Sequence, residues 1–571
     1  MTGTEHANHP ASQNSSACDA PAPVPPRSSW LALAGALLGV FMQMLDTTIV
    51  NIALPDLTVE LGASTAQQLF VLSVYTLAFA CTLLTAATLG GRYGRRRLFV
   101  SALIAFTVTS VLCGVARTPT ELIVFRGVQG VSAALMSAQT LALITALFAK
   151  PLHPRIFGIY GAVAGVAAML GPVIGGVLIS ADIAGWGWRT IFFVNVPIGI
   201  VGCLLAAGRL PQMRDGVRGR PDVVGVVLSS TGLFGLLYPL AVGREQGWPP
   251  QLWAMLAGSA VLLIAFAFHE RRLTRTGGRP LLRTDLFAAR RFTVGLLLSL
   301  LFFSVFAGFF FTVSVSTQFG LGYSPLRTGM LALPFAIGAI VGSVSSGALA
   351  ERLGAPTVLS CGAMVVAIGF GWLAVMLAPD SATLSVPAVI APLLIGGAGT
   401  GLFVAPLQTT ILADTAPETV GSASGCVPTV QQIGASIGLA VVTIFFFAQV
   451  ASQSATAVPA AGSNLAASLE TTSIDPVFRG LVVDRFTRCA SAQLTSPHPD
   501  RPAPGCATHG DRPGLAGRLA AQTGPQIHAA SREVAARTFV GAFRSTLWVL
   551  AAAAVVVAGL CLGLHRSRTT R

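Results

Sequence analysis

Fourteen apolar stretches, separated mostly by short polar turns, constrain this chain more than any other feature of its sequence. A run of about 20 apolar residues is what an α-helix needs to cross a bilayer. We therefore predict an all-α polytopic membrane protein. The predicted spans are residues 29–52, 67–89, 97–116, 120–146, 155–180, 190–208, 223–242, 252–268, 292–316, 327–349, 357–378, 387–411, 421–449 and 541–564.

The charge content excludes an ordinary soluble protein. Only 10% of the 571 residues are charged, whereas about 25% is usual for a soluble domain. The bilayer must therefore be the solvent for most of the surface. A net charge of +14 could also indicate nucleic-acid binding. We reject that interpretation because the arginines lie in short loops between apolar spans, where they set the orientation in the membrane.

The arginines alternate from loop to loop. One set of loops contains Arg92–Arg97, Arg209–Arg220 and a seven-arginine segment from Arg271 to Arg291, whereas residues 53–66 and 379–386 have no lysine or arginine. Basic loops stay in the cytoplasm. We therefore predict a multi-pass protein of the inner (plasma) membrane with both termini cytoplasmic.

An internal repeat suggests how the spans are grouped. Residues Leu89–Gly94 read LGGRYG, and Leu349–Gly354 read LAERLG, 260 positions later. Two six-helix halves with two helices inserted between them account for this offset. The predicted divisions are a disordered cytoplasmic tail (1–28), an N-terminal half (29–208), two extra helices with a linker (209–291), a C-terminal half (292–449 and 541–564), a long extracytoplasmic loop (450–540) and a basic tail (565–571).

The long loop is rich in Ala, Ser, Pro, Gly and Thr. We expect it to be partly disordered, with a short helix near 514–540. Cys489 and Cys506 both fall in it, and outside the cell such a pair can form a disulfide. The other cysteines show no metal-ligand spacing, and we expect most of them to be packing residues.

Motifs at particular spans point to a family. The first span ends Leu45-Asp-Thr-Thr-Ile-Val-Asn-Ile-Ala-Leu-Pro55, the fourth contains Arg126-Gly-Val-Gln-Gly130, and the fifth contains Gly171-Pro-Val-Ile-Gly-Gly176. Together they resemble the major facilitator superfamily, specifically its fourteen-helix drug:proton antiporter branch. The resemblance covers residues 29–450 and the last span. It implies export of amphipathic compounds against proton entry, as in multidrug and antibiotic efflux transporters.

Asp46 is the only acidic residue well inside an apolar span. Intramembrane carboxylates are expensive to bury and mark function by default. Asp46 could carry the coupled proton, or it could simply hydrogen-bond a neighbouring helix. Gln43, Thr47 and Asn51 follow at helical spacing and predict a polar stripe that faces a cavity on the substrate path.

Arg126 is the matching basic residue, in the fourth span. An intramembrane arginine needs a partner, either a carboxylate or the carbonyls of a broken helix. The resemblance links it to proton transfer, and the alternative is a structural anchor. Gln129 completes the motif and is a second candidate on the substrate path.

The fifth span carries a glycine motif. Small residues four apart allow helix backbones to approach closely, and a proline kinks a helix. In the resembled family the motif marks exporters, and the alternative is ordinary close packing. Its members here are Gly161, Gly165, Gly171, Pro172, Gly175 and Gly176.

The basic turn after the second span is either a topology signal or, by resemblance, a cytoplasmic gate that latches the halves. The family usually has an aspartate before the first arginine, where this chain has Gly91. The acidic position of the second copy is filled by Glu351. The gate candidates are Arg92, Gly94, Arg95, Arg96, Glu351 and Arg352.

The remaining candidates are less specific. Phe306 belongs to a phenylalanine-rich ninth span that could line a drug pocket or face lipid. Gln318 and Gln408 are candidate polar contacts to substrate. Trp188 and Arg189 open the sixth span, where aromatic residues typically anchor a helix at the membrane interface.

No catalytic motif is visible, so we expect a transporter and not an enzyme, without a cofactor or a metal. The expected partners are a small-molecule substrate, protons and the lipid bilayer, with no nucleic acid, and we expect a monomer. The leading function is a proton-coupled drug or antibiotic exporter. The alternatives are a dedicated exporter of one endogenous metabolite and, remotely, a membrane receptor or scaffold that no longer transports.

Overall fold

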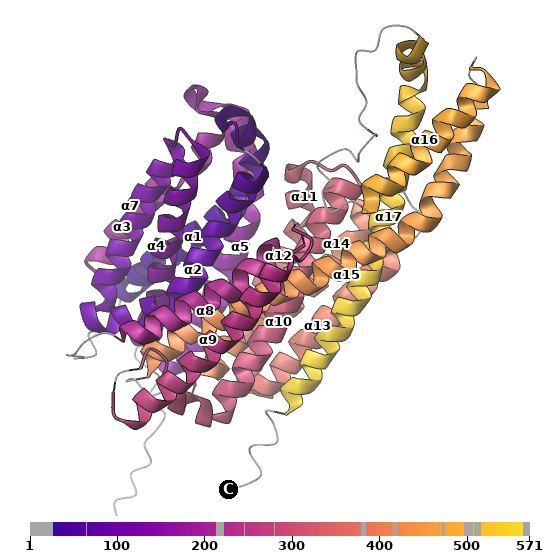
Figure 1. The fold of residues 1–571 in the computed structure, drawn as a ribbon. Helices are drawn as coiled ribbons and strands as arrows, with labels where there is room; N and C mark the ends of the chain where they lie inside the picture. Colours follow the sequence, from indigo (N-terminus) through magenta and orange to yellow (C-terminus); the bar gives the residue numbers. More distant parts are fainter. Residues whose placement is uncertain are drawn as a thin grey trace, which may run out of the picture.

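The computed structural model describes residues 27–63, 65–212, 222–244, 246–278, 280–377, 384–413, 415, 419–470, 474–495, 506 and 515–563. All regular structure in these residues is helical. Fourteen helical segments within them are long and apolar enough to cross a membrane, which agrees with the predicted number. Figure 1 shows the helices as two bundles side by side, with two further helices lying across them.

The N-terminal bundle has its own hydrophobic core, formed around residues such as Phe99, Phe106 and Met136. Its sixth span consists of short helical turns that lead into α7. The helices are α1 (Arg27–Leu61), α2 (Thr65–Tyr93), α3 (Arg95–Gly114), α4 (Pro119–Leu147), η1 (Lys150–Leu152), α5 (His153–Ala181), η2 (Ile183–Gly185), η3 (Gly187–Arg189), α6 (Thr190–Phe193) and α7 (Asn195–Ala207).

The two inserted helices, α8 (Val223–Val242) and α9 (Pro250–Arg275), pack against each other and are followed by the short turn η4 (Thr284–Ala288). The C-terminal bundle surrounds a second, larger core. Its helices are α10 (Arg290–Val315), η5 (Ser316–Gly320), α11 (Pro325–Leu331), α12 (Leu333–Leu353), α13 (Ala355–Met376), α14 (Val386–Leu412), α15 (Val420–Glu470), α16 (Pro476–Thr495) and α17 (Leu515–Leu562).

The sequence repeat is also a repeat of backbone conformation. Gly94 has φ 95° and Gly354 has φ 83°, and each is the residue between two antiparallel spans. The Gly94 amide donates to the Gly90 carbonyl at 3.0 Å, and the Gly354 amide donates to the Ala350 carbonyl at the same distance. A positive φ is strained for residues other than glycine. The repeated turn therefore explains why glycine stands at both positions.

The halves meet along α5 and α2. A Cβ atom placed on Gly158 of α5 would lie 2.6 Å from the Ser343 carbonyl oxygen of α12. A Cβ placed on Gly425 of α15 would lie 2.6 Å from the Cβ of Ala87 on α2. The two bundles therefore touch backbone to backbone at small residues, as membrane helices do when they pack closely.

Over the part of residues 450–540 that the structure describes, the helix expected near 514–540 is present as the first part of α17, whereas the helices of α15 and α16 in this segment were not predicted. There α15 and α17 continue as helices beyond the other spans, and α16 packs against both of them (Figure 1). The apolar stripe Val458, Ala461, Leu465 and Leu469 of α15 forms a small core with Phe486 of α16 and Val534 of α17. We call the described residues of this projection (450–470, 474–495, 506 and 515–540) the extension. Its physical basis is helical periodicity, which an alanine-rich composition hides.

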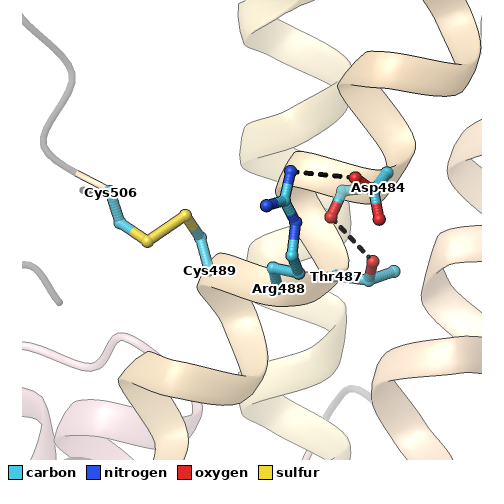
Figure 2. Close-up of a disulfide and its surroundings, with 5 residues drawn as sticks. All are labelled: Asp484, Thr487, Arg488, Cys489 and Cys506. Carbon is cyan, nitrogen blue, oxygen red and sulfur yellow. Dashed lines mark hydrogen bonds and ion pairs between the residues drawn. A yellow bond between two sulfur atoms is a disulfide. The ribbon is translucent and has the colours of Figure 1, made fainter. Parts of the chain in front are cut away.

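The extension contains a disulfide bond. Cys489 of α16 is bonded to Cys506, 17 residues later (Figure 2). Arg488, the residue before Cys489, forms an i,i+4 ion pair with Asp484 at 2.8 Å, and both side chains are exposed. Because the free cysteines of the described residues lie in the spans, this pair is the bridge that the sequence left open.

Candidate functional site

An ion pair lies in the middle of the N-terminal bundle. Asp46 of α1 accepts a hydrogen bond at Oδ2 from Nη1 of Arg126 of α4, and the two side chains are 0% and 1% exposed. The sequence left open whether Arg126 pairs with a carboxylate or with the carbonyls of a broken helix, and the structure shows a carboxylate partner. An arginine buried in a membrane protein without such a partner would be costly.

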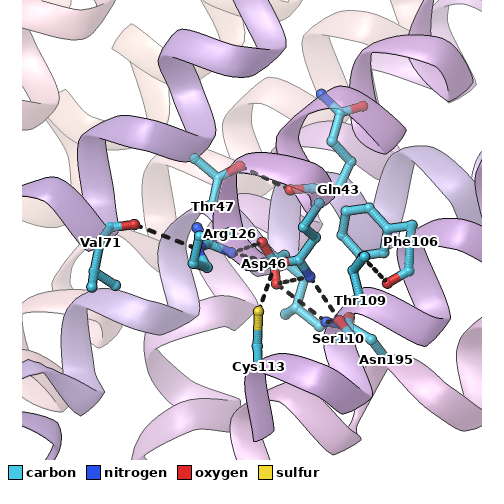
Figure 3. A network of polar contacts seen from close by, with 12 residues as sticks. Gln43, Asp46, Thr47, Val71, Phe106, Thr109, Ser110, Cys113, Arg126 and Asn195 are labelled. Carbon is cyan, nitrogen blue, oxygen red and sulfur yellow. Dashed lines mark hydrogen bonds and ion pairs between the residues drawn. The ribbon is translucent and has the colours of Figure 1, made fainter. Parts of the chain in front are cut away.

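Neutral polar groups complete the surroundings of the carboxylate. Asp46 Oδ1 accepts from Gln129 Nε2 at 3.0 Å and from Asn195 Nδ2 at 3.3 Å. Both amides also donate to Ser110 Oγ, at 2.7 Å and 3.0 Å. Both oxygens of Asp46 are therefore occupied by donors (Figure 3). Sequence reasoning missed Ser110 and Asn195, although each is a polar residue inside an apolar span, which was the available signal.

Arg126 is held by further contacts. Its Nη1 donates to Gln129 Oε1 at 2.8 Å, and its Nε donates to the Val71 carbonyl of α2 at 3.5 Å. The guanidinium also lies 4.3 Å from the ring centroid of Tyr75, a cation–π contact. Arg126 thus has enough partners to stay bound in the bundle when one of them changes.

The network therefore joins α1, α2, α3, α4 and α7. We call Asp46, Arg126, Gln129, Ser110 and Asn195 the buried network. Its two formal charges are opposite in sign, and the guanidinium occupies one carboxylate oxygen of Asp46.

The structure corrects the prediction that Asp46 and its neighbours face a cavity. Asp46 is fully enclosed, and Gln43 is 4% exposed. Thr47 is partly buried and its Oγ1 donates to the Gln43 carbonyl at 2.8 Å, whereas Asn51 is exposed and its Nδ2 donates to the Thr48 carbonyl at 3.2 Å. The stripe divides because Asp46 points into the bundle (Figure 3).

The glycine motif lies between α1 and the C-terminal bundle. A Cβ on Gly171 would lie 2.0 Å from Thr48 Oγ1, and one on Gly175 would lie 2.9 Å from Ile49 Cγ1. These glycines therefore let α5 pack tightly on the helix that carries Asp46.

The other motif positions differ. Pro172, inside α5, contacts Gly329 of α11: a Cβ on Gly329 would lie 3.0 Å from the Pro172 Cβ. A Cβ on Gly176 would meet Leu326 at 3.7 Å, and one on Gly161 would meet Ser343 Oγ at 3.5 Å. A Cβ on Gly165 would meet no atom within 4 Å, so the close packing predicted for the Gly161–Gly165 pair is not found at Gly165.

The gate candidates do not form a single latch. Arg92 and Arg352 are exposed, and Glu351 is exposed without an ion pair or hydrogen bond to another described residue. Arg95 is only 1% exposed, and Arg96 Nη1 donates to the Leu210 carbonyl at 3.4 Å. The acidic residue of the second copy therefore does not replace the missing aspartate through an ion pair in this conformation.

The aromatic residues of α10 build the core of the C-terminal bundle, which neither sequence interpretation anticipated. Phe309 stacks on Phe370 with centroids 4.3 Å apart, and Phe302 stacks on Phe403 at 4.1 Å. Phe306 packs beside them, partly buried. These phenylalanines pack inward, and not toward lipid, because stacked aromatic pairs add stabilisation to that of burial.

The two glutamines lie in different surroundings. Gln318, in the π-turn η5, donates through Nε2 to Ser314 Oγ at 2.8 Å. Gln408 of α14 is 4% exposed, and within the described residues its Oε1 accepts no hydrogen bond. Gln408 is therefore the better placed of the two to bind another polar group.

The sequence had indicated that Trp188 anchors its helix at the membrane interface, but the structure buries this side chain instead. It is 1% exposed, and its Nε1 donates to Glu60 Oε2 at 2.6 Å. Arg189 donates to the other oxygen of Glu60 at 2.8 Å and to the Ala116 carbonyl at 2.7 Å. This cluster ties the end of α1 to the turns before α6.

Comparisons with known proteins agree with this architecture. A family model described as Major Facilitator Superfamily matches residues 36–439. A "Probable actinorhodin transporter" of Streptomyces coelicolor is 36% identical over 437 residues, which are 76% of this chain and 75% of the relative. A "Multidrug resistance protein Stp" of Mycobacterium tuberculosis is 32% identical over 418 residues, 73% of this chain and 75% of the relative.

A solved structure shares the fold. The crystal structure of the human organic anion transporter MFSD10 (TETRAN) superposes with a TM-score of 0.53 and 16% sequence identity. The match covers 74% of this chain and 94% of that protein.

Proposed function

Because this chain belongs to the Major Facilitator Superfamily, we propose that it is a proton-coupled antiporter that exports small amphipathic drugs or antibiotics from the cytoplasm. It is a multi-pass membrane transporter and not an enzyme. The observation that carries the proposal of proton coupling is the buried ion pair of Asp46 and Arg126.

The proposed coupling is a competition for one carboxylate. A proton that reaches Asp46 displaces the Arg126 guanidinium, which cannot itself lose a proton. Arg126 keeps Gln129 and the Val71 carbonyl as partners, so it stays in the bundle. Release of the proton to the cytoplasm restores the ion pair. Each charge that enters contributes about 2.3 kcal/mol per 100 mV of membrane potential.

We propose that α5 couples the ion pair to the packing between the two halves. α1 carries Asp46, and α5 packs on α1 through Gly171 and Gly175. The same helix contacts α12 of the other half at Gly158. A change at the ion pair can therefore shift the packing between the halves, which is the alternation that export requires.

We place both termini and the arginine-rich turns in the cytoplasm, which leaves the extension outside the membrane. The support is the alternation of arginine along the loops. We also propose that the protein acts as a monomer, in lipid, on a small-molecule substrate and protons.

The second candidate is a dedicated exporter of one metabolite. The relative described as a probable actinorhodin transporter favours it, whereas the relative described as a multidrug resistance protein favours a broad substrate range. Both candidates use the same site, so a substrate panel separates them.

The experiment uses inverted membrane vesicles with an imposed pH gradient that is reported by a quenched dye. Cationic dyes and antibiotics are added to wild type, Asp46→Asn and the matched control Asp484→Asn, which changes an exposed aspartate of the extension. Dequenching by several compounds in wild type and control, but not in Asp46→Asn, supports the multidrug antiporter. Dequenching by one compound supports the dedicated exporter. Substrate-dependent dequenching that persists in Asp46→Asn refutes Asp46 as the proton carrier.

A further inference from the structure

Three potential metal ligands meet at one end of the inserted helices. Asp222 is the N-cap of α8, and its Oδ1 accepts from the Gly225 amide at 2.9 Å. His269 and Glu270 lie near the end of α9. One ligand atom of each of these three side chains lies within 4.8 Å of the other two.

Glu270 is the unusual member of this cluster. It is 0% exposed, and its Oε2 accepts from the Leu282 amide at 3.0 Å. Within the described residues its Oε1 is buried and accepts no hydrogen bond. A buried carboxylate oxygen without a donor costs about 1–3 kcal/mol or more. The local fold therefore leaves a place for a positive group beside this oxygen.

Gly225 keeps that place open. A Cβ atom on Gly225 would lie 2.3 Å from Asp222 Oδ2 and 2.6 Å from Glu270 Oε1. The two oxygens thus point toward the same small space, next to a residue without a side chain. His269 Nε2 lies 2.9 Å from Asp222 Oδ1, so the imidazole adjoins the Asp222 carboxylate.

We propose that Asp222, His269 and Glu270 bind a divalent transition-metal ion of the Zn²⁺ class. Imidazole nitrogen and carboxylate oxygen are both zinc ligands, and three protein ligands with water in the fourth position form a known zinc coordination pattern. With bonds of about 2.0 Å, tetrahedral ligand atoms lie about 3.3 Å apart. The three ligand atoms lie within 4.8 Å of one another, so the side chains would close in by at most about 1.5 Å to hold the ion. The two negative charges also neutralise the ion.

Entry to the site is open on one side. The His269 side chain is 28% exposed and Asp222 is 6% exposed, whereas Glu270 forms the closed inner wall. The ion would therefore enter past the imidazole and reach the carboxylate that lacks a donor.

The bound ion would fasten the inserted helices to the C-terminal bundle. It connects α8 and α9 directly, and Glu270 already holds the Leu282 amide. The neighbouring Leu281 carbonyl accepts from Ser422 Oγ of α15 at 3.1 Å. The site would thus hold these segments together, and it shares no residue with the buried network.

The test is calorimetric titration of ZnCl₂ into the full-length protein, purified in detergent without a histidine tag and stripped of metal. Wild type is expected to bind one ion and to gain thermal stability from it. Asp222→Asn, which retains an N-cap side chain, and Glu270→Gln are each expected to weaken binding at least about tenfold. His528→Gln, at an exposed histidine of the extension, is the control and should bind as wild type does.

Gly225→Ala provides an independent variant, since it keeps all three ligands and fills the space between them. It is expected to weaken Zn²⁺ binding while the apo protein remains folded. The absence of one-to-one binding by wild type would overturn the proposal. So would equal affinity in Glu270→Gln, which would show that Glu270 is not a ligand.

Discussion

The ion pair between Asp46 and Arg126 predicts an asymmetric response to mutation. Asp46→Asn leaves a guanidinium that cannot lose its charge inside the bundle. Removing one partner of a buried pair costs about 3–5 kcal/mol of unfolding free energy. Arg126→Gln leaves a carboxylate that can take up a proton and that keeps its bonds from Gln129 and Asn195. We therefore expect Arg126→Gln to be the milder change.

The double variant Asp46→Asn/Arg126→Gln removes both charges. It should cost no more than Asp46→Asn alone, because no uncompensated charge remains. The double-mutant cycle then gives a coupling energy at least as large as the cost of Arg126→Gln alone, within the range of about 0.5–3 kcal/mol that contacting residues show. Proton-coupled transport should be absent from the double variant even though it is no less stable than Asp46→Asn.

The assay is reversible unfolding in mixed detergent micelles, followed by tryptophan fluorescence at several pH values. Single-variant costs that add in the double variant to within about 0.5 kcal/mol would refute the pairing. A larger cost for Arg126→Gln than for Asp46→Asn would refute the argument about charge. Vesicle transport on the same variants separates loss of coupling from loss of fold.

Two further predictions concern packing and the extension. Gly171→Ala places a Cβ 2.0 Å from Thr48 Oγ1 and should cost about 1–3 kcal/mol, whereas Gly165→Ala meets no atom within 4 Å and should be neutral or slightly stabilising; equal melting temperatures of the two variants would contradict this. Reduction of the Cys489–Cys506 bridge, which spans 17 residues, should cost the extension about 3 kcal/mol and speed its proteolysis without changing dye transport; loss of transport on reduction would count against the assignment of the bridge to the extension alone.

The spans and the family could be predicted from the sequence because hydropathy and local motifs are properties of short segments. The number of spans and the family resemblance are confirmed. The turn glycines Gly94 and Gly354 were visible for the same reason, since each belongs to a local repeat.

The helical extension could not be predicted in the same way. The stripe from Val458 to Leu469 includes small residues and gives little signal in an Ala- and Ser-rich segment. Its partner residues Phe486 and Val534 lie on other helices, and their contacts depend on how the chain folds back.

The residues of the buried network were individually visible, but their arrangement was not. Asp46 and Arg126 are 80 positions apart, and Asp46 and Asn195 are 149 apart. A single sequence does not say which spans are neighbours or which face of α1 turns inward. The side-chain direction of Asp46 was predicted wrongly for this reason.

Because α15 is one helix from the C-terminal bundle into the extension, the extension is expected to move together with that bundle. The 21 residues from Val450 to Glu470 rise about 30 Å beyond the predicted end of the span. A tilt of about 10° in the bundle would therefore move the tip by roughly 5 Å, without any bending of the helix. A fluorophore at Val477, which is 71% exposed, would report each swing of the transporter from outside the membrane. A protein that binds the tip and holds it in place would be expected to slow transport.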